Sequence, residues 1–331
     1  MIKDKISSRR MLLKQGKEIA NRVIKNYEIE GHITIKLIGV SDNITYRIDT
    51  DLGERYLLRL HQDKLLNKNQ IISELTWLEY LQERDVVVPQ GVKNIHNCYV
   101  TEFETELKDT KQPCSLMKWV EGRLRQEGIQ HTHLFKVGSM MAKLHNSSSE
   151  FKPDHLFVRP TWGKESIKRD IEKLEKYCDD LMSKEDFAIF QKGVEKISVE
   201  IDEMEKTHHT FGIIHGDLHM GNVVFHKGLP RVIDFGRCGY GFYQYDIAQT
   251  LLGIAPSQRR SFIEGYESIR KLPGNHQDCL ETFFIMACIE NISFHSSNPQ
   301  EKEDLIRKSP FIAKLIKLYL SGEGFLYGRS K

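Results

Sequence analysis

One stretch, residues 211–246, constrains the fold of this chain more than any other. It begins with a short apolar run, 211–214, which predicts a buried strand. His215-Gly216-Asp217 then breaks into a loop, because glycine and aspartate favour turns over strands. The next strand begins directly after Asn222, so Asp217 and Asn222 lie at the two ends of one tight connection.

A hairpin is predicted to follow this loop. Residues 223–225 and 231–233 are apolar enough for two strands, and 228–230, Gly-Leu-Pro, is a turn between them. The second strand delivers Asp234 at its end. A hairpin of this kind returns Asp234 to the neighbourhood of Asn222.

Asp217, Asn222 and Asp234 together supply the oxygen atoms of a metal and nucleotide site. Two carboxylates and one amide are hard ligands of the kind that Mg²⁺ prefers. Mg²⁺ usually takes only one or two protein carboxylates and completes its shell with water and substrate phosphates. We therefore expect Asn222 and Asp234 to bind magnesium and Asp217 to act on the attacking hydroxyl.

The order H-x-D-x-x-x-x-N followed by I-D-F-G is similar to the catalytic and metal-binding loops of the protein-kinase-like superfamily. The glycine after His215, the second His219, and the later runs 239–241 and 245–248 resemble its small-molecule branch, the aminoglycoside phosphotransferase and choline kinase family. This resemblance implies an α+β, protein-kinase-like bilobal fold with an antiparallel-sheet N-lobe and a mainly helical C-lobe. It also implies ATP or GTP as donor, Mg²⁺ as cofactor and a small-molecule hydroxyl as acceptor.

The same resemblance implies roles for five residues. Asp217 would be the catalytic base, and Asn222 and Asp234 would bind Mg²⁺. His215 would brace the catalytic loop, and Asp246 would anchor it from a following helix.

An alternative uses the same residues differently. His215, Asp217 and His219 stand at alternate positions and could be ligands of a transition metal in a hydrolase, since imidazole with carboxylate is a common zinc or iron set. That interpretation leaves the I-D-F-G run unexplained. A second alternative makes Asp217 and Asp234 ordinary turn residues. His219 by itself is expected to be a packed or hydrogen-bonded residue.

The first third of the chain predicts the antiparallel meander that covers ATP in a kinase. Its strands are short, alternating runs separated by a turn at 51–54, and a helix with apolar residues at helical spacing follows them. The predicted strands are 33–38, 44–50, 55–61, 86–88, 99–103 and 114–120, and the predicted helix is 69–84.

Arg59 lies inside the third strand, between leucines that face the other way. A cation projected beneath the nucleotide can neutralise phosphate charge, and Glu74 on the next helix can hold the side chain in place. Protein kinases carry Lys here, whereas choline-kinase-like members often carry Arg, whose planar fork suits phosphate. The alternative is an arginine that faces solvent.

The expected phosphate loop, 39–46, lacks the G-x-G-x-x-G run of protein kinases. A Gly, a Ser and an Asn in a short turn resemble the small-molecule kinases more closely. Backbone amides near Ser41 and Asn43 are the candidates for a contact with the β-phosphate.

Residues 116–122 have the position of the hinge between the two lobes. Backbone groups there, at Met117 and Trp119, would contact adenine. We therefore expect a nucleotide-binding lobe over 1–120 and a helical lobe with the catalytic loop and acceptor site over 121–331.

Helical periodicity dominates the second lobe apart from the catalytic hairpins. Residues 131–145 predict one helix, and 257–320 predict three or four more. Residues 164–206 predict two helices that project as an insertion. Acidic residues outnumber basic ones in that insertion. If it lines the acceptor cleft, it would favour a substrate with an ammonium group, and the alternative is a solvated charged face.

Composition excludes several classes of protein. The formal net charge is +2, without a basic cluster interleaved with aromatic residues, which argues against a nucleic-acid partner. Six cysteines without a C-x-x-C pair are expected to be mostly reduced core residues. No apolar stretch approaches the ~20 residues of a membrane span, so we expect a cytoplasmic protein without a membrane partner. The oligomeric state is left open.

The leading interpretation is an ATP- and Mg²⁺-dependent kinase of a small, amine-bearing hydroxyl compound such as an aminoglycoside, choline or homoserine. A protein Ser/Thr kinase, a metal-dependent hydrolase and a nucleotide-binding pseudokinase are the alternatives. No A-P-E element follows Asp234, which argues against a protein kinase, and every expected catalytic side chain is present, which argues against a pseudokinase. Arg237, just after I-D-F-G, could repel a cationic acceptor or pair with a neighbour, which argues against a polycationic aminoglycoside.

Overall fold

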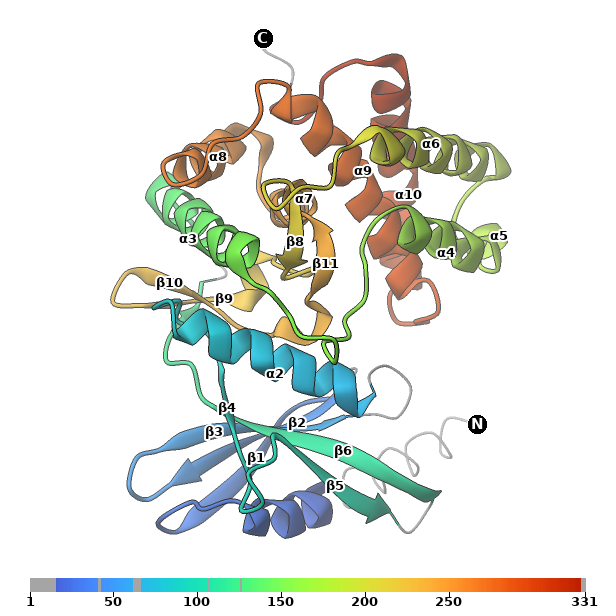
Figure 1. The fold of residues 1–331 in the computed structure, drawn as a ribbon. Coiled ribbons are helices and arrows are strands. Elements are labelled where there is room, and N and C mark those ends of the chain that lie inside the picture. The colour runs from blue at the N-terminus through green and yellow to red at the C-terminus, as the bar shows by residue number, and fades with distance from the viewer. Residues whose placement is uncertain (1–15, 41–42, 62–66, 106–107, 126, 329–331) are drawn as a thin grey trace. The chain divides into compact units, whose positions relative to one another are not determined.

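The chain forms two compact units, which are described separately. Unit 1 contains the described residues up to Glu121 together with 152–158, and unit 2 contains 122–151 and the described residues from Arg159 onward. The computed structural model describes residues 16–40, 43–61, 67–105, 108–125 and 127–328. An antiparallel sheet dominates the first unit and helices dominate the second, so the predicted α+β class is confirmed (Figure 1).

Unit 1 is built on one antiparallel sheet. The strand order is β1-β2-β3-β6-β4, and β5 also pairs with β6. The three leading strands form the meander that the sequence predicts. The strands are β1 (Ile33–Val40), β2 (Asn43–Thr50), β3 (Arg55–His61), β4 (Gln90–Val92), β5 (Val100–Thr105) and β6 (Lys108–Lys118).

One face of this sheet is covered by the helical residues 16–23 and the short turn η1 (Ile24–Asn26). Leu58 and Leu60 of β3 are buried in this apolar cluster. Because successive side chains of a strand point to opposite faces, Arg59 between them faces the other side of the sheet. That side is where its ion-pair partner on α2 lies.

Helix α2 (Lys68–Gln82) begins at Asn67, whose side chain accepts a hydrogen bond from the backbone of Gln70 in a capping box. The strand predicted at 86–88 is wrong. The backbone N–H of Val86 donates instead to the carbonyl of Leu81 at 3.1 Å, so this apolar run closes the end of α2, and the strand that follows it is β4.

Unit 2 is a bundle of helices around two small sheets. One sheet has the order β10-β9-β7 and the other pairs β11 with β8. Its strands are β7 (Arg123–Leu124), β8 (Phe211–Ile214), β9 (Val223–His226), β10 (Leu229–Val232) and β11 (Gly239–Phe242). Its helices are α3 (His131–Glu150), α4 (Lys164–Glu175), α5 (Cys178–Leu181), α6 (Lys184–Glu203), α7 (Tyr243–Leu252), α8 (Arg259–Glu267), α9 (His276–His295) and α10 (Lys302–Ser321), with short 3-10 turns η2 (Met220–Asn222), η3 (Phe235–Arg237) and η4 (Pro256–Gln258).

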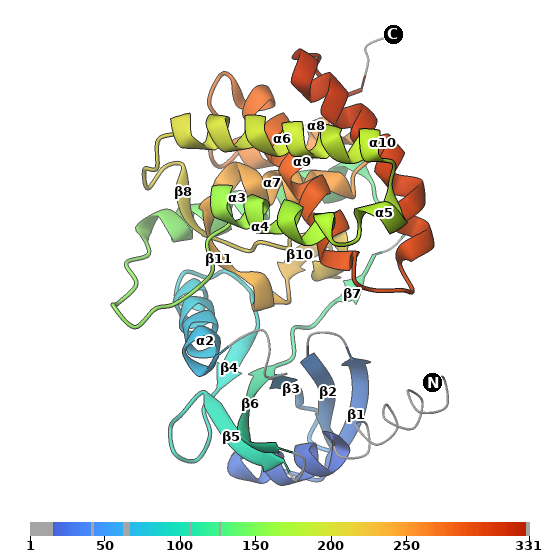
Figure 2. The ribbon, with the colours of Figure 1, turned by 90° about the vertical axis from the view of Figure 1, so that its right-hand side faces the viewer.

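Helix α9 is the centre of the bundle, and helices α4, α6, α7 and α10 pack on it (Figures 1 and 2). Ile167 and Leu174 of α4 and Phe190 and Ile197 of α6 are fully buried in this packing. The expectation that 164–206 projects as an insertion is therefore wrong. Its apolar residues at helical spacing are core contacts of the bundle.

Helices α3 and α8 approach closely because each presents a glycine to the other. A Cβ added at Gly138 would lie 2.0 Å from the carbonyl oxygen of Phe262, and one added at Gly265 would lie 1.9 Å from that of Phe135. This close packing holds α3 in position. Helix α3 carries the buried side chain of His145, which lies near the loop that contains Asp217.

The hairpin β9–β10 turns one residue earlier than the sequence suggests. Lys227 and Gly228 form its two-residue loop, and both have positive φ, as the favoured hairpin turns require. Leu229 and Pro230 already belong to β10. The register pairs Val232 with Val223, which sets the ends of both strands side by side.

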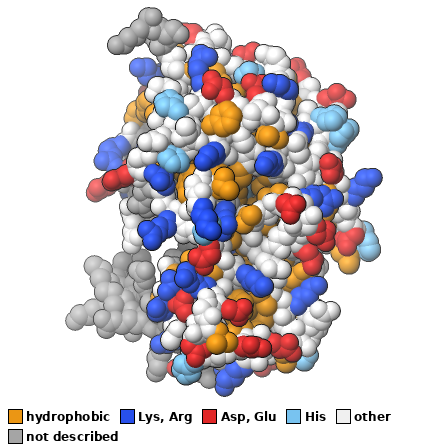
Figure 3. Space-filling view, turned by 90° about the vertical axis from the view of Figure 1, so that its left-hand side faces the viewer, with side chains coloured by type: hydrophobic (Ala, Val, Ile, Leu, Met, Phe, Trp, Pro, Cys, Tyr) orange, Lys and Arg blue, Asp and Glu red, His pale blue; other side chains and the backbone are white. Residues whose placement is uncertain are grey.

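The surface and the cysteines add little to the assignment of function. On the face shown in Figure 3, basic and acidic side chains are interspersed. The six cysteines all lie within the described residues and none forms a disulfide, and Cys114, Cys238 and Cys288 are buried. In the described part of the chain, no helix combines the length and the apolar character that crossing a membrane requires.

Candidate active site

The loop between β8 and η2 carries Asp217, and buried hydrogen bonds to α7 hold this loop in place. The backbone N–H groups of His215 and Gly216 donate to the two carboxylate oxygens of Asp246, at 2.7 and 2.8 Å. The hydroxyl of Thr250, one turn further along α7, donates to the carbonyl of Leu218. The main chain on both sides of Asp217 is therefore fixed to α7.

Asp246 itself is completely buried and has a second partner. Nε2 of His145 on α3 donates to it at 3.2 Å, and the hydroxyl of Tyr266 donates to Nδ1 of the same ring at 2.9 Å. Burial opposes ionisation of Asp246, but hydrogen bonds from His145 and from the His215 backbone lower its pKa. Burial also lowers the pKa of His145, which keeps the ring neutral. A buried carboxylate thus anchors the loop.

The ring of His215 is fully used within the loop. Its Nδ1 accepts a hydrogen bond from the backbone N–H of Asp217 at 3.3 Å, and its Nε2 donates to the carbonyl of Ile233 at 3.1 Å. Neither nitrogen is directed at a metal. His219 is exposed, and its Nδ1 accepts from the N–H of Gly221 at 3.0 Å. The hydrogen bonds of His215 and His219 do not support the transition-metal site of the hydrolase alternative. Within the described ranges, no group of three or more His, Cys, Asp or Glu suited to a metal is found.

Asn222 and Asp234 are brought together at the base of the β9–β10 hairpin. The backbone N–H of Ile233 donates to the carbonyl of Asn222 at 3.0 Å, so Asp234 directly follows the residue that pairs with Asn222. The side-chain nitrogen of Asn222 donates to the carbonyl of Asp217 at 2.9 Å, which fixes the amide and leaves its oxygen as a metal donor. The three residues expected to form the site therefore lie on adjoining turns.

Asp234 has a left-handed backbone, with φ of 64° and ψ of 68°. This conformation costs about 1 kcal/mol for a residue other than glycine, although Asp and Asn tolerate it best. Strain of this kind collects at functional sites, where the surrounding structure holds it in place. Its carboxylate is exposed, as a ligand that must meet a metal and phosphates needs to be.

Burial raises the pKa of Asp217, and the negative charge of Asp234 acts in the same direction. The guanidinium of Arg237 and the rings of His215 and His219 oppose that rise. A carboxylate in this environment is a better proton acceptor than an exposed one.

The turn after Asp234 is held by two side chains that the sequence interpretation did not single out. Arg159 donates to the carbonyls of Cys238 and Gly236, both at 2.6 Å. Nε1 of Trp162 donates to the carbonyl of Arg237 at 3.1 Å. Nothing in the local pattern around 159–162 marks these roles, since the partners lie more than seventy residues away.

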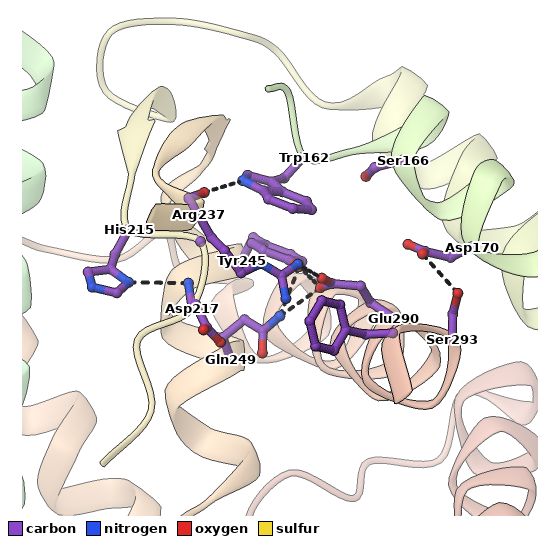
Figure 4. Close-up of polar contacts among 12 residues, drawn as sticks. Trp162, Ser166, Asp170, His215, Asp217, Arg237, Tyr245, Gln249, Glu290 and Ser293 are labelled. Atoms are coloured by element: carbon purple, nitrogen blue, oxygen red, sulfur yellow. Dashed lines mark hydrogen bonds and ion pairs between the residues drawn. The ribbon is translucent and has the colours of Figure 1, made fainter. Parts of the chain in front are cut away.

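Arg237 lies at the centre of a polar network beside Asp217 (Figure 4). Its guanidinium forms an ion pair with Glu290 of α9. Glu290 also accepts hydrogen bonds from the hydroxyl of Tyr245 and, at 2.8 Å, from Nε2 of Gln249. Of the two possibilities for Arg237, pairing with a neighbour is the one observed.

In unit 1, Arg59 is buried and forms an ion pair with Glu74 of α2, with 2.6 Å between Nη2 and Oε1. The same Nη2 lies 3.6 Å from the sulfur of Met117 on β6. The alternative of a solvent-facing arginine is therefore wrong. Glu74 fixes the cation on the face of the sheet opposite the apolar cluster.

For the other residues expected to contact nucleotide, the structure gives only their place in the sheet or no position. Ser41 lies outside the described residues, and Asn43 begins β2 opposite His61. Met117 pairs with strands on both sides, and the N–H of Trp119 donates to the carbonyl of Arg55 at 3.0 Å. A contact of Met117 with a base would therefore use its side chain rather than its main chain.

The sequence as a whole matches a known family. The profile of the phosphotransferase enzyme family matches residues 34–277, which includes both the Arg59–Glu74 pair and the catalytic loop. The chain belongs to this family. It is a small-molecule phosphotransferase, a kinase whose acceptor is a hydroxyl group.

Individual relatives agree with this assignment. An uncharacterized protein of Synechocystis is 28% identical over 294 residues, which cover 84% of this chain and 77% of that protein. The structure of a microcompartment-associated aminopropanol kinase has a TM-score of 0.78 at 22% identity and covers 92% of this chain and 98% of its own. An amicoumacin kinase in complex with AMP-PNP, Ca²⁺ and its antibiotic also has a TM-score of 0.78, at 15% identity and 95% coverage of each chain.

Other solved structures with this fold include a spectinomycin phosphotransferase and a choline kinase from Cryptosporidium parvum. The resemblance to the aminoglycoside phosphotransferase and choline kinase family is therefore confirmed, together with the kinase-like fold.

Proposed function

We propose that this phosphotransferase transfers the γ-phosphate of ATP, in the presence of Mg²⁺, to the hydroxyl of a small amine-bearing compound. The convergence of Asp217, Asn222 and Asp234 on adjoining turns carries the proposal. These are the residue types that phosphoryl transfer needs, one base for the acceptor and two oxygen donors for the metal.

The residues present suit Mg²⁺. The amide of Asn222 is oriented by its bond to the Asp217 carbonyl, and Asp234 contributes an exposed carboxylate. One amide oxygen and one carboxylate leave most of an octahedral shell to water and phosphate oxygens, as Mg²⁺ sites usually do. When bound, Mg²⁺ would neutralise negative charge on the phosphates and orient them.

Asp217 would orient the acceptor hydroxyl and accept its proton at a carboxylate oxygen. Its backbone is held by the ring of His215, and the loop around it by Asp246, so the carboxylate can be positioned without movement of the loop. Preorganisation of this kind supplies much of the rate enhancement in phosphoryl transfer.

Unit 1 would bind the nucleotide. Arg59 is the cation best placed for phosphate, because Glu74 holds its guanidinium on the face of the sheet opposite the apolar cluster and a planar guanidinium suits phosphate. Met117 would pack against the base, with backbone groups near Ser41, Asn43 and Trp119 as further candidates. We propose ATP as the donor by analogy with the amicoumacin kinase structure, which contains AMP-PNP, and GTP is the alternative because a kanamycin complex of the same fold contains GDP.

The amine in the acceptor has two supports. The structures that resemble this chain best among those described above are named for an aminopropanol and for amicoumacin. The region drawn around Asp217 also contains the carboxylate of Asp170, whereas that of Glu290 is paired with Arg237.

The test is nucleotide consumption with a panel of amino alcohols, with and without Mg²⁺, by the wild type and by Asp217→Asn. General-base catalysis predicts a fall in kcat of about a thousandfold with little change in the KM for ATP. Asp179→Asn, at an exposed position of α5, is the control for loss of one carboxylate. Turnover by Asp217→Asn at a rate close to that of the wild type would refute the proposal.

A further inference from the structure

Asp170 is a carboxylate without a counter-ion near the catalytic loop. It lies on α4, is partly buried, and accepts a hydrogen bond from the hydroxyl of Ser293 at 3.0 Å. Among the described residues, no Lys, Arg or His lies within ion-pair distance of it. Lys173, one turn along the same helix, donates to the carbonyl of Phe294 at 3.1 Å instead.

The guanidinium that acts on Asp170, that of Arg237, already has an ion-pair partner. Arg237 is paired with Glu290, which Tyr245 and Gln249 also bind. Asp170 therefore lies near an ion pair that has no net charge, and its own carboxylate adds one negative charge. Burial and the neighbouring charge of Glu290 raise the pKa of Asp170 to about 6, whereas the hydrogen bond from Ser293 and the charges of Arg237 and Lys173 act in the opposite direction.

Aromatic side chains adjoin these charges. The guanidinium of Arg237 lies 4.6 Å from the ring centre of Trp162 and 5.1 Å from that of Phe294. Trp162 is held by its bond to the Arg237 carbonyl and stacks on Tyr245 with an interplanar angle of 7°. In Figure 4, Trp162 and Asp170 extend from the α4 side toward Arg237 and Glu290. Ring faces beside a carboxylate provide an apolar surface that also favours cations.

The network extends from Asp170 to Asp217, the proposed general base. Arg237 acts electrostatically on Asp217 and on Asp170, so both carboxylates lie within the range of one guanidinium. In Figure 4 the side chain of Arg237 lies between the two carboxylates, so an acceptor whose hydroxyl lies at Asp217 can extend along Arg237 toward Asp170.

From these observations we infer that Asp170 is the specificity residue of the acceptor site and binds the single ammonium group of a small amino alcohol. The hydroxyl of that molecule is presented to Asp217, and its carbon skeleton lies against Trp162 and Phe294. The inference rests on the proposed function, since it names the acceptor class of the same site.

Arg237 sets the upper limit on charge. Its own charge is neutralised by Glu290. Because Asp217 takes the acceptor hydroxyl, Asp170 is the carboxylate left to neutralise one ammonium group. A second ammonium on the same molecule would lie near the guanidinium without a carboxylate to pair with, and unpaired like charges exclude wrong partners. Alcohols with one amine are accepted and polyamines such as kanamycin are rejected.

The experiment compares 1-amino-2-propanol with 1,2-propanediol, which replaces the amine by a hydroxyl, in wild type and Asp170→Asn. Loss of a charge-assisted hydrogen bond should raise the KM for the amine about 10- to 100-fold. The KM for 1,2-propanediol and for ATP should not change. Glu172→Gln, an exposed carboxylate on the same helix, should behave as the wild type.

Lys173→Gln distinguishes ligand recognition from a structural role. If Asp170 served only to balance Lys173, this variant would weaken the site as Asp170→Asn does. Removal of a cation beside an ammonium site should instead leave the KM for the amine unchanged or lower it. Calorimetric titration of 1-amino-2-propanol into each nucleotide-bound variant gives the same comparison without turnover.

The outcomes separate the two proposals. Nucleotide turnover that shows no preference for the amine, or that falls equally for both alcohols in Asp170→Asn, overturns the inference and leaves the proposed function standing. If wild type turns over neither alcohol, the proposed function is in question, and calorimetry decides the inference. Binding of the amine that is lost in Asp170→Asn supports it, and absence of binding to the wild type overturns it.

Discussion

Replacement of Asp170 by Asn should stabilise the folded chain at neutral pH, although the same change should weaken acceptor binding. The pKa of this carboxyl rises from its ordinary value of 3.8 to about 6, chiefly because it is buried and secondly because Glu290 is near. The folded chain therefore holds the proton more tightly than the unfolded chain does, and ionisation of Asp170 destabilises the fold. A difference of this size corresponds to about 3 kcal/mol. Solvent screening of a partly exposed group reduces the expected gain to about 1–2 kcal/mol.

The pH dependence gives the sign of the effect. Above pH 6 the wild-type carboxylate is charged in both states, and the advantage of Asp170→Asn is complete. As the pH falls from about 6 to about 4, the folded wild type takes up the proton, and the advantage disappears. Glu290, Arg237 and Lys173 are the charged groups that act on Asp170, and Asn replaces the carboxylate without altering them.

The assay is chemical denaturation of both variants at pH 8 and pH 5, without nucleotide or acceptor. Glu172→Gln on the same helix is the control, because it removes an exposed carboxylate and should change the midpoint little at either pH. Asp170→Asn should have the higher midpoint at pH 8 and a smaller lead at pH 5. A variant that is less stable at pH 8, or equally favoured at both pH values, would refute the reasoning.

Four further outcomes follow from the same structure. Asp234→Asn should shift the Mg²⁺ titration of nucleotide binding to higher concentrations, and an unchanged titration would exclude Asp234 as a ligand. Arg59→Ala should raise the KM for ATP by the equivalent of about 1–3 kcal/mol, measured by steady-state kinetics, since a charge-assisted phosphate contact is lost. Asp246→Asn should lower the free energy of unfolding by about 2–4 kcal/mol at pH 7, because two backbone N–H groups and His145 lose a charged acceptor. The loss should shrink as the pH falls toward the lowered pKa of the wild-type carboxyl. Gly216→Ala should lose activity and thermal stability together, because its φ is +73° and an added Cβ would lie 2.6 Å from the carbonyl oxygen of Arg237.

The parts of the site that the sequence predicts are those fixed by local pattern. Asp217 and Asn222 bound a single short connection, and a hairpin brings Asp234 back to it, so periodicity and turn chemistry were sufficient. Alternation along β3 likewise placed Arg59 on the face opposite Leu58. Local rules failed at 86–88, where an apolar run resembles a strand but closes the end of a helix. They failed also at 164–206, where charge suggested an exposed insertion although the apolar positions are core.

The parts that the sequence does not predict depend on contacts between distant segments. His145 meets Asp246 from 101 positions away, and Arg237 meets Glu290 across 53. Neither His145 nor Glu290 stands in a run that marks it as functional, since each lies on a helix whose apolar residues account for its pattern. Buried polar groups of this kind become visible only when their partners are known, because burial without a partner would be costly.

Arg237 shows why the charge of a site cannot be obtained by adding residues along the chain. As an isolated cation after I-D-F-G it would repel an ammonium substrate, and the acidic excess of 164–206 would attract one, so composition gives contradictory answers. The ion pair with Glu290 removes Arg237 from this balance. Asp170 and Asp217 are then the carboxylates drawn in Figure 4 that have no ion-pair partner among the described residues, and the proposed function assigns Asp217 to the acceptor hydroxyl. Selectivity for one ammonium then depends on Glu290 as much as on Asp170. If Glu290 were replaced by Gln, Arg237 would lose its partner and its charge would offset that of Asp170, so the preference for an ammonium-bearing acceptor should weaken.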